Sequence, residues 1–290
     1  MVRIALVTAR AAQGTDDDLE PLLDALTRAG MHADSPCWDD ADIVWGDFDL
    51  AVLRSPWDYV TRYPEFLGWL EAAEAHVPVL NPSPIVRWNT DKHYLVDLAA
   101  HGVPVVPTEY FEPDRPAPQL AIATGELVVK PVISAGSKDT MRHSDAGAAE
   151  RHLHALLATN RAVMVQPYLE GIDTYGETGL VYFDGVFSHA FRKAPILALD
   201  APPTNEFFAP EEITAREPTA DERRVADATI ARCGGADLLY GRIDLVPGPD
   251  DLPIVLEVEL TEPSYFVAQA PESADRFAAA VQRRVASITQ

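Results

Sequence analysis

Short apolar segments alternate with amphipathic ones along the first 85 residues. Apolar runs at 2–7, 49–53 and 77–80 predict buried strands. Leucines at helical spacing within 16–28, followed by Gly30, predict one helix, and the segment 64–75 predicts another. Strands that alternate with helices are typical of a parallel sheet covered by helices. We therefore expect an N-terminal α/β domain over residues 1–85.

The pattern changes beyond residue 85. A helix is predicted over 91–100. Strands are predicted after it, at 127–130, 163–165, 180–183 and 186–191. Only Asp184 and Gly185 separate the last two strands, and this spacing predicts a hairpin within a largely antiparallel sheet.

The last third of the chain opens with an irregular segment. Residues 194–220 hold five prolines and little periodicity, which predicts a mobile loop. Thr219 and Glu222 form a capping-box pattern at the start of a predicted helix that ends at Cys233. Strands are then predicted at 240–246 and 254–260, and a helix over 273–288.

Charge and composition narrow the class of protein. The chain has 23 basic and 45 acidic residues, and its net charge of −22 argues against nucleic acid and anionic membranes as partners. Its apolar runs are too short to span a bilayer, and its start does not have the pattern of a signal peptide. With only Cys37 and Cys233 and no sign of a disulfide, we expect a cytoplasmic protein, either a monomer or a homodimer.

Several common site motifs are missing. The sequence contains neither G-x-G-x-x-G nor G-x-x-x-x-G-K-[ST], the two most frequent nucleotide-binding patterns, and no G-x-S-x-G nucleophile motif. His152 and His154 lie two residues apart in a predicted helical stretch, where their side chains diverge, so we expect no metal site there.

The lysines lie in segments that suit phosphate binding. Only four of the 23 basic residues are lysines, namely Lys92, Lys130, Lys138 and Lys193. Lys92 belongs to the segment 89–92, which is predicted to open a helix, and Lys130 lies at the end of a predicted strand. The small residues of 133–140 follow, and such a loop can present backbone N–H groups to phosphate oxygens beside the ammonium group.

Three acids are expected to share one face of two adjacent strands. Glu257 and Glu259 lie at positions i and i+2 of an apolar strand, so both point the same way, and Asp244 belongs to the preceding strand. Such acids repel one another unless a cation compensates, and hard oxygen ligands suit Mg²⁺ that bridges to phosphates. The alternative is a solvated strand face, which shows the same alternation.

The order of these segments resembles that of the ATP-grasp ligases over residues 85–290. Five motifs are also similar to the O-ureido-D-serine cyclo-ligase group of D-cycloserine biosynthesis, an antibiotic pathway: V-T-A-R, R-S-P-W-D-Y, W-N-T-D-K, S-H-A-F-R-K and L-E-V-E-L-T-E-P. The resemblance implies an α/β and α+β fold, in which an ATP-grasp domain over 86–290 follows the parallel domain. That domain would have two lobes with antiparallel sheets, a small lobe over about 105–168 and a large lobe over about 169–290.

The resemblance also implies ATP and Mg²⁺ as cofactors. Lys92 and Lys130 would contact the phosphates, together with the loop residues Ser134, Gly136 and Ser137. The strand residues Gln166, Pro167, Tyr168 and Leu169 would hold the adenine, and Asp173, or as second choice Glu177, the ribose. Asp244 and Glu257 would ligate Mg²⁺, whereas Glu259 stands where the family usually has Asn, which leaves its role open.

A small amino-acid-like substrate is expected between the lobes. The segment 54–59 follows a buried strand, so its side chains emerge at an edge where α/β sheets bind ligands. Arg54 suits a carboxylate and Asp58 an α-ammonium, and Trp57 and Tyr59 either contact the substrate or pack the domain interface. His189 is either a ligand of the substrate or a core residue. The candidate catalytic cations are Arg192, which is expected at the transferred phosphate, Lys130 and Arg242.

These expectations lead to an ADP-forming carbon–nitrogen ligase. It would activate a carboxylate as an acyl phosphate and cyclise O-ureido-D-serine to D-cycloserine with release of CO₂ and NH₃, while a lid over 194–212 excludes water. Two alternatives stay open. One is an intermolecular ligase that joins two amino acids or extends a peptide, and the other is a non-catalytic nucleotide-binding module.

Overall fold

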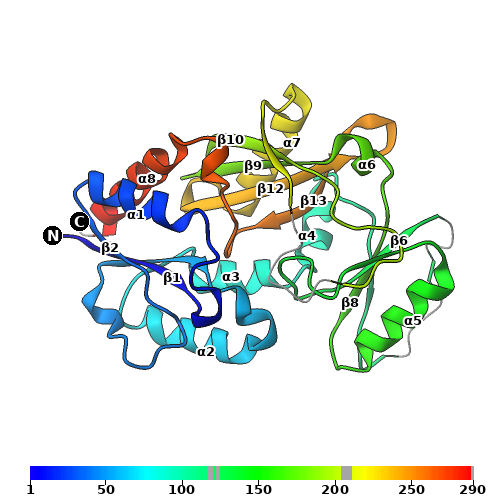
Figure 1. Cartoon of the computed structure of the whole chain (residues 1–290), viewed down its shortest axis with the longest axis horizontal. Helices are drawn as coiled ribbons and strands as arrows, with labels where there is room; N and C mark the ends of the chain where they lie inside the picture. The colour runs from blue at the N-terminus through cyan, green and yellow to red at the C-terminus, as the bar shows by residue number, and fades with distance from the viewer. Residues whose placement is uncertain (116–119, 122–124, 204–210, 289–290) are drawn as a thin grey trace.

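The N-terminal part of the chain forms a parallel sheet covered on both faces (Figure 1). The structure, a computed structural model, describes residues 1–115, 120–121, 125–203 and 211–288. The strand order is β2-β1-β3-β4, with β1 (Arg3–Thr8), β2 (His32–Asp34), β3 (Leu50–Ser55) and β4 (Val79–Leu80). The predicted parallel α/β arrangement is confirmed. The sequence pattern missed β2, because only one of its three residues is apolar.

Alternation along β1 separates two hydrophobic cores. Ile4 and Leu6 pack with α1 (Leu19–Arg28) and the C-terminal helix α8 (Ser273–Ile288), while Ala5 and Val7 pack with α2 (Tyr63–Glu74). Successive strand residues point to opposite faces, so an apolar run of this kind needs cover on both sides of the sheet.

The C-terminal half contains a five-stranded antiparallel sheet of order β11-β10-β9-β12-β13. Its strands are β9 (Glu177–Phe183), β10 (Val186–Lys193), β11 (Ile213–Arg216), β12 (Tyr240–Pro247) and β13 (Pro253–Glu259). The predicted hairpin at Asp184 and Gly185 is confirmed, as is the capping box of α7 (Ala220–Cys233). The prediction of a loop over 194–220 is wrong at β11, which is a short edge strand that pairs with β10.

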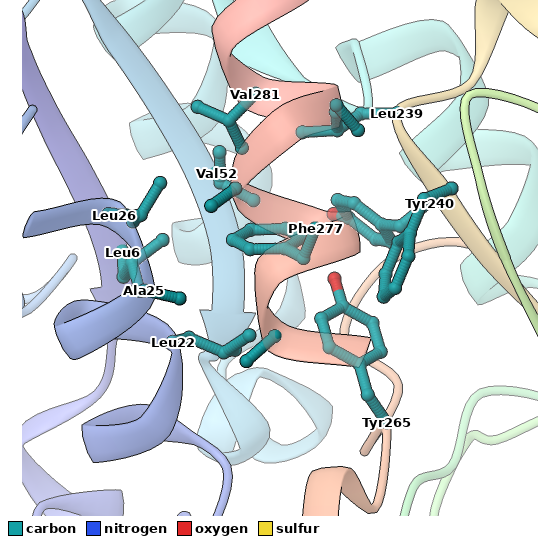
Figure 2. Close-up of a cluster of buried hydrophobic side chains, with 14 of the residues drawn as sticks. Leu6, Leu22, Ala25, Leu26, Val52, Leu239, Tyr240, Tyr265, Phe277 and Val281 are labelled. Carbon is teal, nitrogen blue, oxygen red and sulfur yellow. The ribbon is translucent and has the colours of Figure 1, made fainter. Parts of the chain in front are cut away.

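One core joins this sheet to the parallel sheet. Helix α8 lies between them, and Figure 2 shows Phe277 of α8 between Leu22 of α1 and the pair Tyr240 and Tyr265. Helix α7 packs on the opposite face of the antiparallel sheet. No helix of the described ranges is long and apolar enough to cross a membrane. Both cysteines are buried and free.

A second antiparallel sheet, of order β5-β8-β6-β7, forms a smaller layer. Its strands are β5 (Glu109–Phe111), β6 (Leu127–Pro131), β7 (Met141–His143) and β8 (Val163–Pro167), and α5 (Ala146–Leu157) covers one face. After β8 the chain forms a short helix, α6 (Gly171–Tyr175), which was not among the predicted elements. This helix determines where Asp173 points.

Two helices connect the parallel sheet to the rest of the chain and cover the free edge of β13. They are α3 (Ser83–Thr90) and α4 (Tyr94–Ala100). The segment 89–92 therefore does not open a helix, because Asn89 and Thr90 are the last residues of α3 and Lys92 lies in the turn before α4. The Asn89 side chain bonds Val258 O and Leu260 N at 2.7 Å each, and the Tyr94 hydroxyl bonds Val258 O and N. These bonds satisfy an edge that would otherwise be unpaired and hold β13 in place.

Candidate active site

A cleft lies between the two antiparallel sheets and the segment that follows β3. One end of it is apolar, and the cluster there consists of Val106, Val128, Tyr168, Leu169, Ile172, Leu197 and Leu256. Gln166 and Pro167 line the cleft as well, and the Gln166 side chain donates to Thr108 Oγ1 at 2.9 Å. An apolar pocket with few polar groups suits a flat heteroaromatic ring. The four residues predicted to hold adenine are thus brought together, and their contact with a nucleotide stays a prediction.

The two strands at the centre of the cleft carry its acids. In the antiparallel ladder Asp244 lies opposite Glu257, and Arg242 lies opposite Glu259. All four side chains line the cleft. The register therefore places the three predicted metal ligands together, as their spacing implied, and adds an arginine among them.

Arg242 compensates two of these acids. Its Nε and Nη2 atoms donate to both carboxylate oxygens of Asp244 at 2.8 Å, Nη2 also bonds Glu259, and Nη1 donates to Ser264 O at 3.0 Å. The expected repulsion between the acids is thus reduced by a buried guanidinium. A planar arginine fork suits this bidentate geometry.

Lysines compensate the third acid. Lys92 Nζ lies 3.0 Å from Glu257 Oε1 and donates to Ser134 O at 2.6 Å, so it ties β13 to the small-residue loop. Burial alone would raise the pKa of Glu257, but Lys92 and Lys130 outweigh it and lower that pKa. Burial lowers the pKa of Lys130, which lies in the cleft beside Glu257. Ser134, Gly136 and Ser137 line the cleft together with the two lysines, and their contact with phosphates stays a prediction.

Lys193 is a cleft cation that the sequence did not assign to the site. Its Nζ lies 3.5 Å from Glu177 and 3.6 Å from Glu211. These acids outweigh burial and raise its pKa, while burial raises the pKa of Glu177. Lys193 lies opposite Glu177 in the β9–β10 ladder, and the alternation of side chains along β10 places it on the face opposite Arg192.

The end of the cleft near the N-terminal region is polar and aromatic. Trp57 and Tyr59 line it from the segment after β3, and Glu262, Ser264 and Phe266 line it from the segment after β13. The residues between the latter three are buried, so the segment 261–266 alternates like a strand. Tyr59 is hydrogen-bonded to Glu262, and burial raises the pKa of Glu262 to about 7. Glu262 was not among the predicted site residues, although it belongs to the motif L-E-V-E-L-T-E-P.

Two predicted substrate residues lie outside this lining. Arg54 is fully buried, and its guanidinium pairs with Asp16 at 2.8 Å and with Asp18 at 3.5 Å and donates to Pro263 O at 2.6 Å. It is therefore a structural residue that is not exposed to the cleft. Asp58 accepts from Trp38 Nε1 at 2.8 Å and pairs with Arg62 at 3.0 Å, so the expectation that it holds an ammonium is corrected too.

Three further candidates also lie away from the cleft. Asp173 forms a bidentate pair with Arg142 at 3.1 Å and accepts from the Tyr168 hydroxyl at 2.6 Å, because α6 turns it outward. Arg192 donates to Tyr175 O at 2.7 Å from the opposite face of β10. His189 bonds Tyr265 O at 2.7 Å, and burial lowers its pKa, as expected for the core reading. Of the two ribose candidates, Glu177 is the one in the cleft.

The predicted lid is described only in part. Ile196, Leu197 and Glu211 line the cleft, whereas residues 204–210 lie outside the described residues. The lid therefore stays a prediction.

The donors present suit Mg²⁺ in company with phosphates. Within the described ranges, no group of three or more His, Cys, Asp or Glu is arranged to hold a metal ion by itself. Of the three predicted ligands, Asp244 has both carboxylate oxygens bonded to Arg242. Glu257 and Glu259 present hard oxygen donors from one strand face, and both line the cleft. Mg²⁺ is commonly bound through one or two carboxylates together with substrate phosphates, so a preformed cage is not needed.

Comparison with known proteins gives concordant matches. The family model for the N-terminal domain of the D-cycloserine synthetase DcsG matches residues 4–81. The cycloserine biosynthesis protein DcsG of Streptomyces lavendulae is 41% identical over 97% of this chain and 98% of its own length. The crystal structure of D-cycloserine synthetase DcsG is 40% identical, with a TM-score of 0.86 over 98% of this chain and 99% of that chain.

A more distant structure shares the fold alone. The D-alanine–D-alanine ligase from Bacillus anthracis, solved in complex with ATP, is 16% identical with a TM-score of 0.69, over 99% of this chain and 98% of that chain.

Proposed function

The chain belongs to the DcsG family of ligases with the ATP-grasp fold, and we propose that it cyclises O-ureido-D-serine to D-cycloserine at the expense of ATP. One observation carries the proposal. A single cleft joins an apolar pocket, a centre with lysines and acids, and a far end with Glu262 and two aromatic residues. These parts suit, in that order, a nucleotide base, a triphosphate and a small zwitterionic amino acid.

The proposed reaction begins with transfer of the γ-phosphoryl group of ATP to the substrate carboxylate, which gives ADP and an acyl phosphate. The ureido nitrogen that is bonded to oxygen then attacks the acyl carbon, and the bond to phosphate breaks. The nitrogen loses its proton, inorganic phosphate leaves, and a five-membered ring closes. Hydrolysis of the carbamoyl group consumes one water and releases CO₂ and ammonia. The nucleophile belongs to the same molecule as the acyl group, so ring closure gains from a high effective molarity.

The residues of the cleft would act mainly by position and charge. Lys92 and Lys130 would neutralise the phosphates, and Arg242 would stabilise charge at the carboxylate under transfer. Glu257 and Glu259 would hold Mg²⁺, which when bound neutralises phosphate charge. The buried setting strengthens each of these interactions, because charges attract more strongly where water is excluded. The need for ATP as cosubstrate is consistent with a cytoplasmic enzyme.

The test is incubation of the purified protein with Mg²⁺–ATP and single amino acids, O-ureido-D-serine included, with ADP release and product mass measured together. We expect ADP release with O-ureido-D-serine alone, and a product with the mass of cycloserine. ADP release that requires two amino acids would contradict the cyclisation and support an intermolecular ligase. ATP binding without stimulation by any amino acid would contradict a catalytic role.

A further inference from the structure

The acids of the cleft differ in whether they have a cationic partner. Five of the six are in ion pairs: Glu257 with Lys92, Glu177 and Glu211 with Lys193, and Asp244 and Glu259 with Arg242. Glu262 makes no ion pair with any residue that the structure describes. A carboxylate that is taken out of water without a cation loses solvation that nothing replaces. Glu262 is therefore the acid of the cleft that is free to pair with a cation from outside the chain.

The main chain around Glu262 is held on both sides. Trp57 Nε1 donates to Glu262 O at 3.1 Å, Arg54 donates to Pro263 O at 2.6 Å, and Arg242 donates to Ser264 O at 3.0 Å. With these carbonyls fixed, the alternation of the segment directs the side chain of Glu262 into the cleft. The carboxylate is thus preorganised, and a ligand that meets it has little ordering cost to overcome.

Tyr59 determines which part of the carboxylate stays available. Its hydroxyl is hydrogen-bonded to Glu262, and burial raises its pKa well above the usual value, so it acts as a donor. One hydroxyl satisfies only part of a carboxylate, which has about four acceptor sites. The sites that remain can accept only from a donor within the cleft.

The distribution of charge along the cleft indicates which donor this is. Six acids and four cations line it, an excess of two negative charges. The four cations lie at the centre, where the triphosphate and the carboxylate under transfer would be held. A divalent cation would be drawn to Glu257 and Glu259, so at the far end the remaining acid is left for a positive group on the second substrate.

We propose that Glu262, oriented by Tyr59, binds the α-ammonium group of the amino-acid substrate and so makes this end of the cleft selective for zwitterions over plain carboxylic acids. The inference rests on the proposed function, since it identifies the part of the substrate that this end of the cleft binds. It replaces Asp58 as the residue for that group.

The test compares two substrates in two proteins. O-Ureido-D-serine carries the ammonium, and 3-(ureidooxy)propanoic acid lacks it while keeping the carboxylate and the ureido group. In the wild type we expect the KM of the second compound to be about 10–100-fold higher, which is the usual effect of one charged hydrogen bond. In Glu262→Gln we expect the KM of O-ureido-D-serine to rise by that factor, with no change for the analogue or for ATP. Glu272→Gln, at an exposed glutamate of the same C-terminal segment, is the matched control.

Three results would overturn the inference, and they are distinguishable. Equal losses for both compounds in Glu262→Gln would mean that the carboxylate acts on another group, such as the attacking nitrogen. Equal KM values for the two compounds in the wild type would show that no ammonium site exists, whether or not the variant folds. If the wild type releases no ADP with O-ureido-D-serine, the proposed function itself fails. Tyr59→Phe provides a second variant, for which a smaller rise with the same selectivity is expected.

Discussion

The carboxylate of Asp18 accepts a hydrogen bond of 2.6 Å from the backbone amide of Tyr265, 247 residues later in the chain. The same carboxylate accepts from the amides of Phe266 at 3.0 Å and Val267 at 2.7 Å. Arg54 stacks on the Tyr265 ring, with its guanidinium carbon 4.4 Å from the ring centroid. The segment that carries Glu262 is thus anchored by the N-terminal region.

We predict that Asp18→Ala weakens both stability and substrate use. Three amides, two of them buried and one partly buried, lose a charged acceptor, and Arg54 loses one of its two carboxylate partners. The free energy of unfolding should therefore fall by about 3 kcal/mol. The kcat/KM for the amino-acid substrate should fall at least about tenfold, with the KM for ATP unchanged. Urea unfolding and steady-state ADP release measure both effects. Asp17→Ala, at an exposed neighbouring residue, should behave as the wild type. A rise in the KM for ATP in Asp18→Ala would contradict this prediction, because it would mean that Asp18 supports the nucleotide end of the cleft.

The two ribose candidates give opposite predictions. Glu177 lies in the cleft, whereas Asp173 is held outside by Arg142. We expect Glu177→Gln to raise the KM for ATP about tenfold or more, since a charged hydrogen bond is lost, and Asp173→Asn to leave it unchanged. Use of 2′,3′-dideoxy-ATP separates the ribose contact from any effect through Lys193, because only the former disappears when the hydroxyls are absent. An effect of Asp173→Asn alone would restore the first choice made from the sequence.

Lys130→Met should separate catalysis from folding. The ammonium group is buried and its pKa is lowered by that burial, so an apolar side chain of similar length should not destabilise the fold. Loss of one positive charge at the phosphates typically costs about 10²–10³ in rate. ADP release should fall by this factor while the unfolding midpoint stays level or rises. Arg87→Met, an exposed cation on α3, is the control for the substitution itself. Unchanged turnover would exclude Lys130 from the phosphate site.

A pair of histidines in the smaller sheet layer predicts sensitivity to acid. His143 Nε2 and His152 Nδ1 lie 3.0 Å apart, and burial lowers both pKa values, that of His152 to about 4. In the unfolded chain both titrate near 6.5, so below that pH the unfolded state binds more protons and is favoured. Stability should therefore be full above pH 6.5 and decline as the pH falls from there towards 4.

His152→Gln removes the titrating group, and its urea midpoint should fall less than that of the wild type between pH 7.5 and pH 5. His154→Gln changes an exposed histidine on the same helix and should follow the wild type. Parallel declines in all three proteins would assign the acid sensitivity to carboxylates elsewhere in the chain.

The local sequence pattern was sufficient to predict many of the helices and strands of this protein. The period of two in 254–260 placed Glu257 and Glu259 on one face, and the capping box located the start of α7, because both features depend on neighbours within one turn or one strand. Residue order and motifs led to the family. Among the elements that the pattern missed, β2, β11 and α6 have three, four and five residues and little apolar periodicity.

What only the tertiary structure decided is the direction and the partner of each polar side chain. Arg54, Asp58 and Asp173 have the chemistry of ligand-binding residues, yet each is bonded to another side chain of the protein. The charged partners of Arg54 and Asp173 lie 31 to 38 residues away in sequence. Lys193 lies in the site because of the strand register, and Glu262 lies there because the Asp18 anchor holds its segment against the cleft. Sequence determines which groups are available, whereas their pairing depends on distances between elements far apart in the chain, and so only the folded molecule shows which acid is left without a cation.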